Sequence, residues 1–325
     1  MRFQKVIVLN ASNASLCSSN QLPSIKEYFE GAYVYGIAFY SAGALVLLLV
    51  LLLFADSLRH VLHSSSPRFK TYTAYVLAVY PVICLLSYMT ILVPRAYLLS
   101  DALMQVTLTS SLYQLFCLFV AYCEGEATLA KKVGDTKLSL KTNPLCCCCS
   151  MLPAFDVTKS TMKFLKIQVL QLPIVQGFIY LLYLVMWLES QELYEGAYWY
   201  LQSFIIVSFL CGIWGLNMTT KLLTKGVDGK FLFQKKLTIL QLVIPLTQLQ
   251  AFIKKSLVQY GVLPCNPPLV PMFYGNLIFN AVNMVEMLLL GFCARNLYKR
   301  GLPEINDRSI QAGGIISTVF GSVAG

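Results

Sequence analysis

The sequence contains little charge. Charged residues make up 12% of the 325 residues, whereas 57% are hydrophobic. Soluble domains carry about twice that share of charge, so these few groups could not cover the apolar surface in water. Eleven cysteines, four of them consecutive, are too sparse for a secreted disulfide-rich scaffold. The composition therefore indicates an integral membrane protein.

Histidine is also scarce, and motifs for enzymatic chemistry are absent. The two histidines, His60 and His63, lie near one carboxylate, Asp56, and this set is a poor metal site. The sequence has no Walker-type glycine loop, no nucleophile motif and no histidine–carboxylate cluster. We therefore expect no cofactor, no metal site and no enzymatic activity. No internal repeat is visible either, which argues against two inverted halves.

Long apolar stretches dominate what is present. A bilayer core about 30 Å thick is crossed by roughly 20 apolar residues in a helix. The sequence contains seven such stretches, at residues 33–54, 71–93, 102–122, 165–188, 197–218, 237–253 and 270–294. A β-barrel would instead show alternating segments of about ten residues. We predict an all-α membrane protein with seven transmembrane helices, of which the sixth is interrupted by Lys254 and Lys255.

The loop charges predict the orientation of the chain. Of the 25 Lys and Arg residues, 19 fall in the first, third and fifth loops and the C-terminal tail, and 6 fall on the other side. Cytoplasmic loops carry such an excess, so the N-terminus should be outside and the C-terminus in the cytosol. The net charge of +10 is then a topology signal and a contact for anionic membrane lipids, and we expect no nucleic-acid partner.

Three regions follow from this topology. We expect an extracellular tail at 1–32, a seven-helix transmembrane domain at 33–294 with a cytosolic cysteine-rich loop at 123–164, and a cytosolic tail at 295–325. Asn10 and Asn13 begin glycosylation sequons in the extracellular tail, where they could be modified.

The cysteine run of the third loop is predicted to be acylated. It comprises Cys146, Cys147, Cys148 and Cys149. A reducing cytosol disfavours disulfides there, and adjacent cysteines cannot easily close around one zinc ion. S-acylation would hold the loop at the inner leaflet, and unmodified loop cysteines are the alternative.

Polar residues inside the apolar stretches are the candidates for function. Glu286 lies well inside the seventh stretch, where an acid costs about 2.5–3.5 kcal/mol on insertion scales. Asn276, Asn280 and Asn283 precede it on the same face of a helix. We expect this stripe to face a hydrated cavity. A structural ion pair between Glu286 and Lys254 or Lys255 is the alternative.

Other stretches offer matching polar residues. The whole candidate substrate pathway comprises Glu286, Asn283, Asn280, Asn276, Gln241, Gln248, Gln168, Gln171 and Arg95. The glutamines could equally serve as contacts between helices, and Arg95 could reach the membrane interface. Pro173 and Pro245 free backbone carbonyl groups within the fourth and sixth stretches.

An acidic loop is expected between the fourth and fifth stretches. Glu189, Glu192 and Glu195 crowd it with no cation nearby in the sequence. A solvated turn is the simpler interpretation, and an electronegative entrance or a contact with a partner is the alternative.

Several segments together resemble one known family. They are Leu92-Val93-Pro94-Arg95, Glu124-Gly125-Glu126, the cysteine run, Gly229-Lys230-Phe231, Cys265-Asn266-Pro267-Pro268 and Glu286. Over residues 30–300 the chain resembles the organic solute transporter alpha subunit family, and a sister family of seven-span transmembrane proteins shares part of the pattern.

The resemblance implies a function and a partner. It implies facilitated, bidirectional movement of steroid-derived organic anions, such as bile acids and steroid sulfates, across the plasma membrane. It also implies a heteromer with a small single-span beta subunit, and acylation of the cysteine run. A seven-helix receptor, or a lipid-handling membrane protein without transport activity, is the alternative. The segment after the third stretch lacks the acidic-Arg pair typical of such receptors.

Overall fold

The computed structural model describes residues 33–65, 67–123, 137–138, 155–156, 158–226, 232–264 and 270–300. The glycosylation sequons at Asn10 and Asn13, the cysteine run at Cys146–Cys149 and the tail after residue 300 lie outside the described residues. Predictions that concern those segments therefore stay predictions.

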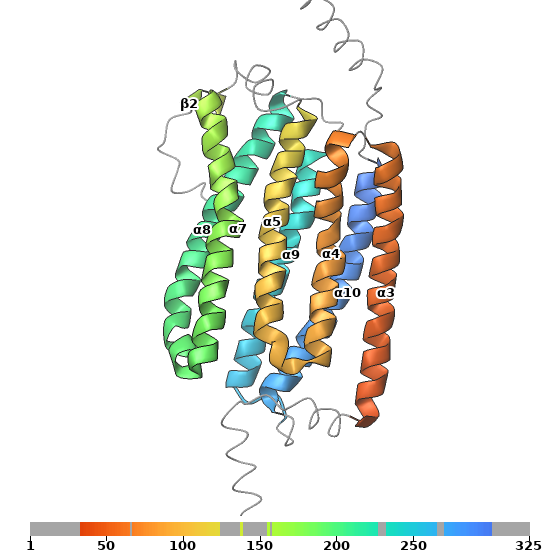
Figure 1. Cartoon of the computed structure of the whole chain (residues 1–325), viewed down its shortest axis with the longest axis vertical. Helices are drawn as coiled ribbons and strands as arrows, with labels where there is room; N and C mark the ends of the chain where they lie inside the picture. The colour runs from red at the N-terminus through yellow and green to blue at the C-terminus, as the bar shows by residue number, and fades with distance from the viewer. Residues whose placement is uncertain are drawn as a thin grey trace, which may run out of the picture.

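Within the described residues, seven long helices lie side by side (Figure 1). They are α3 (Tyr33–Ser64), α4 (Pro67–Leu92), α5 (Tyr97–Tyr122), α7 (Lys159–Glu189), α8 (Gln191–Gly226), α9 (Phe233–Gln259) and α10 (Pro271–Arg300). A short 3-10 helix, η1 (Pro94–Ala96), joins α4 to α5. Two short strands, β1 (Lys137–Leu138) and β2 (Phe155–Asp156), pair in antiparallel fashion.

All seven helices are long and apolar enough to cross a membrane. The prediction of an all-α fold with seven spans is therefore confirmed. The helices exceed the predicted stretches: α3 runs to Ser64 instead of residue 54, and α8 begins at Gln191 instead of residue 197. Helical hydrogen bonding continues past the apolar segment because hydropathy marks only the part that lies in hydrocarbon. Lys254 and Lys255 do not interrupt α9, which is continuous through both.

Helices that follow each other in sequence pack as hairpins. α4 packs against α3 and α5, α7 against α8, and α10 against α3, α4 and α9. We call the end of the bundle that holds η1 the Arg95 end, and the end where α5 finishes the Tyr122 end. Because the number of these long helices is odd, the start of α3 and the end of α10 lie at opposite ends of the bundle (Figure 1). The loop charges predict that the Arg95 end is extracellular.

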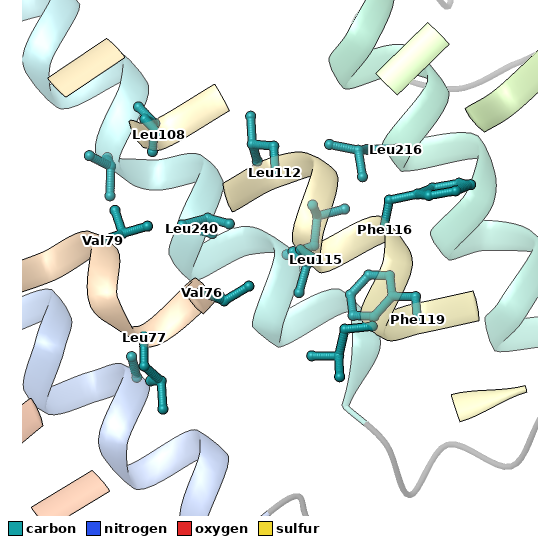
Figure 2. Close-up of a cluster of buried hydrophobic side chains, with 14 of the residues drawn as sticks. Val76, Leu77, Val79, Leu108, Leu112, Leu115, Phe116, Phe119, Leu216 and Leu240 are labelled. Carbon is teal, nitrogen blue, oxygen red and sulfur yellow. The ribbon is translucent and has the colours of Figure 1, made fainter. Parts of the chain in front are cut away.

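The hydrophobic core lies toward the Tyr122 end. In Figure 2, buried side chains of α4, α5, α8 and α9 meet, and on α5 they recur with helical spacing. The residues that Figure 2 labels are Val76, Leu77, Val79, Leu108, Leu112, Leu115, Phe116, Phe119, Leu216 and Leu240. This contact closes the bundle on that side with apolar side chains.

Glycines bring α7 and α8 into close contact. A Cβ atom added at Gly212 of α8 would overlap the side chain of Leu172 on α7. A Cβ atom at Gly215 would lie 3.1 Å from Cβ of Gln168. Small residues allow such backbone approach between transmembrane helices.

Ionic contacts tie α3 to α10. Only 6% of the residues in the most apolar segment of α3 are buried, compared with 56% in α4, so most of α3 is exposed on the outside of the bundle. Asp56 Oδ2 accepts a hydrogen bond from Arg295 Nε at 2.5 Å and another from Lys299 Nζ at 2.8 Å. Asp56, considered in the sequence as a neighbour of the two histidines, therefore pairs with basic residues of α10.

Candidate functional site

A cavity of about 760 Å³ opens among the helices toward the Arg95 end. Its volume falls within the range of roughly 300–1,000 Å³ that is typical of small-molecule sites. At its inner limit the cavity reaches Leu108, which also belongs to the core in Figure 2. The cavity therefore ends where the packed core begins.

Charged side chains of both signs line this cavity. Arg95, Lys254 and Lys255 are its basic groups, and Asp101 and Glu195 are its acidic groups. They come from η1, α5, α8 and α9, which are separated in sequence but meet at the Arg95 end. The cavity therefore presents charged groups of both signs inside the bundle.

Four of the predicted pathway residues line the cavity: Arg95, Gln248, Asn280 and Asn283. The other five, Asn276, Gln241, Gln168, Gln171 and Glu286, are not among its lining residues. The polar stripe on α10 is therefore divided between the cavity wall and contacts with neighbouring helices.

Asn283 joins α10 to α4 at the cavity wall. Its side chain is 5% exposed, and its Nδ2 donates a hydrogen bond to Ser87 Oγ at 2.7 Å. The same nitrogen lies 3.9 Å from the sulfur of Met104 on α5. Its Oδ1 is buried without a hydrogen-bond partner in the described structure. This oxygen is therefore an unpaired acceptor enclosed beside the cavity wall.

Lys254 binds Asn276 and does not pair with Glu286. Its Nζ donates a hydrogen bond to Asn276 Oδ1 at 3.0 Å, which links α9 to α10. Lys255 points elsewhere, with Nζ 3.4 Å from the ring centroid of Tyr198. The alternative of an ion pair between Glu286 and either lysine is therefore wrong, because both ammonium groups have other neighbours at the Arg95 end.

Glu286 lies behind the cavity wall. Its carboxyl group is beside the side chain of Gln250 on α9, and Gln250 lines the cavity. The two groups are not aligned for a hydrogen bond, since Glu286 Oε2 and Gln250 Nε2 are both buried without a partner in the described structure.

The remaining predicted glutamines lie outside the cavity. On α7, Gln171 Nε2 donates a hydrogen bond to Gln168 Oε1 at 3.0 Å, so these two side chains contact each other. On α9, Gln241 Nε2 is buried without a partner in the described part of the chain.

One wall of the cavity is aromatic, and it was not predicted from the sequence. The wall comprises Tyr97, Tyr180, Tyr183, Trp187, Tyr194, Tyr198 and Trp199. Tyr183 stacks on Tyr198 with ring centroids 5.7 Å apart and meets Tyr194 at 5.5 Å. Tyrosine and tryptophan near the ends of spans usually form belts at the membrane interface, so the sequence pattern of such a wall cannot be distinguished from that of a belt. Near the junction of α7 and α8 these tyrosines are spaced by three and four residues, which places them on one face of each helix and could have indicated the wall.

The predicted acidic loop is largely helical. Ser190 alone separates α7 from α8, so Glu192 and Glu195 belong to the first turns of α8. Glu195 lines the cavity and accepts a hydrogen bond from Gln191 Nε2 at 2.9 Å. Lys254 and Lys255, which are distant in the sequence, line the same cavity.

A second polar cluster lies at the Tyr122 end. Lys236, counted in the sequence among the loop lysines, is only 1% exposed. Its Nζ donates to Tyr122 Oη at 3.3 Å and lies 4.9 Å from the ring centroids of both Tyr122 and Tyr298. This contact joins α5, α9 and α10 beside the core.

Metal-binding geometry is not found in the part of the chain that the structure describes. No group of three or more His, Cys, Asp or Glu residues there could hold an ion.

Known proteins are similar to this chain along most of its length. Residues 38–301 match the family described as "Organic solute transporter Ostalpha". The chain is 26% identical to an organic solute transporter alpha-like protein of Drosophila melanogaster, over 90% of this chain and 89% of that protein. It is 23% identical to an organic solute transporter subunit alpha of Danio rerio, over 84% of this chain and 86% of that protein.

A third relative, an organic solute transporter subunit alpha of Leucoraja erinaceus, is 24% identical over 67% of this chain and 63% of that protein. No solved structure matches the chain. Because the family match covers all seven helices except the first residues of α3, this multi-pass membrane protein belongs to the organic solute transporter alpha family.

Proposed function

We propose that this protein is the alpha subunit of a facilitative, bidirectional transporter of steroid-derived organic anions, including bile acids and steroid sulfates. The observation that carries the proposal is the cavity, which combines basic side chains with an aromatic wall. An amphipathic anion could place its charged group near Lys254 and Arg95 and its rings against the tyrosines. Aromatic side chains bury much apolar area while keeping a polar tip, so they suit a hydroxylated steroid.

A solute must pass the core to leave on the other side. The cavity is open toward the Arg95 end and stops at the core, so passage requires a rearrangement of the helices at the Tyr122 end. We propose that Glu286, Gln241, Gln168, Gln171 and Asn276 line the path in that second arrangement. Supporting this, Glu286 Oε2 and Gln241 Nε2 are buried without partners in the described structure, although buried polar groups are normally paired.

Bidirectional, passive movement fits the sequence. The chain contains no Walker-type loop that could bind a nucleotide, so the solute gradient would set the direction of net flux.

Assembly and location complete the proposal. We propose that the chain functions at the plasma membrane with a small single-span beta subunit, with the N-terminus outside. Acylation of Cys146–Cys149 would hold the third loop at the inner leaflet, and Asn10 and Asn13 would carry glycans.

Flux through purified protein tests the proposal. Proteoliposomes with and without a single-span subunit would be loaded with a labelled steroid sulfate, and both uptake and efflux would be followed. We expect saturable flux in both directions. Lys254→Gln should raise KM about tenfold, because it removes a charged contact worth about 1.4 kcal/mol. Glu286→Gln should lower the maximal rate.

The matched control is Lys235→Gln, because Lys235 is exposed at the Tyr122 end and does not line the cavity. It should leave both KM and the maximal rate unchanged. Unaltered flux in Lys254→Gln and Glu286→Gln at normal protein levels would remove both residues from the mechanism. Absence of flux in every arm would contradict the function itself.

A further inference from the structure

Asp101 is a cavity residue that an anion carrier does not need. It lies near the start of α5 and lines the cavity, yet it forms no ion pair or hydrogen bond with a described residue. Lys254 acts on it electrostatically from a distance but donates its hydrogen bond to Asn276. A carboxylate in this position repels an anionic solute and attracts a cationic group.

The aromatic wall already holds an ammonium group. Lys255 Nζ lies 3.4 Å from the ring centroid of Tyr198 and 5.6 Å from that of Trp199. A cation over such rings is attracted by about 0.5–1 kcal/mol at exposed sites and by about 2 kcal/mol or more when desolvated. Lys255 therefore shows that this part of the wall has the geometry to receive a substituted ammonium.

Asp101 and the aromatic wall face the same space. Tyr97 and Asp101 are four residues apart on α5 and so share a face of the helix. The ring of Tyr97 packs edge-on against Trp187 of α7, with centroids 6.4 Å apart. Glu195, on the first turns of α8, adds a second carboxylate to this cavity. Aromatic faces and carboxylates together form the usual surroundings of a bound organic cation.

We propose that Asp101 and the aromatic wall form a subsite for a substituted ammonium group, and that the Lys255 side chain covers the aromatic part of this subsite when no solute is bound. The cavity then accepts zwitterionic amphiphiles as well as anions. The ammonium of such a solute displaces the amine of Lys255 from Tyr198, and its anionic group lies toward Lys254 and Arg95. This inference rests on the proposed function, because the zwitterion uses the same cavity.

Two steroids with the same cholic amide body and a terminal sulfonate provide the test, one without and one with a cationic group in a longer linker between them. Taurocholate carries a sulfonate on a cholic amide, and the sulfobetaine CHAPS carries the same body and terminal sulfonate with a dimethylammonium between them. Uptake of each into proteoliposomes, below its critical micelle concentration, would be compared with protein-free liposomes. The ratio of CHAPS uptake to taurocholate uptake is the readout, because a general loss of folding or activity does not change it.

Wild-type protein should take up both steroids. Asp101→Asn should lower the ratio about tenfold, and Lys255→Gln should raise it, since the internal ammonium no longer competes. Trp199→Leu, at a mostly exposed position, should lower the ratio and serves as a second variant if Asp101→Asn does not fold. Glu192→Gln removes an exposed acid that does not line the cavity and should leave the ratio unchanged.

Three results have distinct meanings. Uptake of taurocholate without CHAPS would overturn the ammonium subsite and leave the proposed function standing. An unchanged ratio in both Asp101→Asn and Trp199→Leu would overturn it as well. Failure of the folded wild-type protein to take up either steroid would overturn the proposed function.

Discussion

At the residue scale, the two lysines that contact aromatic rings inside the bundle differ in their surroundings. Lys236 is enclosed at the Tyr122 end by the rings of Tyr122 and Tyr298, whereas Lys255 lies on the aromatic wall at the Arg95 end. Both lysines hold an ammonium group against aromatic faces, but Lys255 lines the cavity at the Arg95 end, whereas Lys236 is not among its lining residues. We infer that Lys236 stabilises the closed end and that Lys255 can be displaced.

Substitutions of Lys236 separate its packing from its charge. Lys236→Ala should lower the free energy of unfolding by about 2–5 kcal/mol, because it empties a fully buried position between three helices. Lys236→Met fills most of that volume and should cost less than about 1.5 kcal/mol. Unfolding of the purified protein in mixed micelles would measure both. Lys235→Ala, at the exposed neighbouring position, is the control and should change little.

If Lys236→Ala and Lys236→Met lower the free energy of unfolding equally, the charged group, and not the volume of the side chain, holds α5, α9 and α10 together.

The sequence identified candidate residues of the site more successfully than it predicted which of them contact each other. Four of nine pathway residues line the cavity, among them Asn280 and Asn283 of the predicted stripe. Helical spacing placed the asparagines on one face but could not say that Lys254 would bind Asn276. Asp101 and the aromatic wall were missed because an acid and tyrosines at span ends also suit the membrane interface. Their meeting depends on how four helices pack.

At the element scale, hydropathy was sufficient to predict the number and kind of spans. The ends of α3 and α8 were placed too far inward, because polar residues continue a helix beyond the hydrocarbon. The run of Glu189, Glu192 and Glu195 suggested a loop, yet α8 begins at Gln191. Pair contacts between helices, such as the close approach of α7 and α8, could not be predicted from periodicity alone.

Gly212 makes that close approach testable. Gly212→Ala places a methyl group against Leu172, so α7 and α8 must separate or Leu172 must shift. We expect a loss of about 1–3 kcal/mol in the free energy of unfolding, as for other overpacked contacts. Gly196→Ala on the same helix is the control, because a Cβ atom there meets nothing within 4 Å. It should be neutral or slightly stabilising, since alanine favours a helix.

If Gly212→Ala and Gly196→Ala have the same free energy of unfolding, α7 and α8 do not pack as closely as the structure shows.

At the scale of the whole molecule, the bundle has one open and one closed half. The cavity lies in the half near η1, and the core side chains of Figure 2 lie toward the Tyr122 end. The loop charges predict that the open half faces the outside of the cell. In this arrangement a solute would reach the cavity from that side.

Cysteine accessibility tests the orientation. In a background without other cysteines, Gln191→Cys would mark the Arg95 end and Lys235→Cys the Tyr122 end, where both native side chains are exposed. A membrane-impermeant maleimide should label Gln191→Cys on intact cells and Lys235→Cys only after permeabilisation. The reverse pattern would place the N-terminus in the cytosol.

The central claim is that solute occupies the cavity lined by Asn280. In the same cysteine-free background, Asn280→Cys places a thiol in the cavity, whereas Ile278→Cys places one on an exposed apolar position of α10 that does not line it. The most direct measurement is the rate at which a charged thiol reagent, added from the Arg95 end, modifies Asn280→Cys with and without steroid sulfate. We expect rapid modification that steroid sulfate slows and that blocks flux, with little reaction at Ile278→Cys. Modification of Asn280→Cys at the same rate in both conditions, with flux intact, would contradict the account.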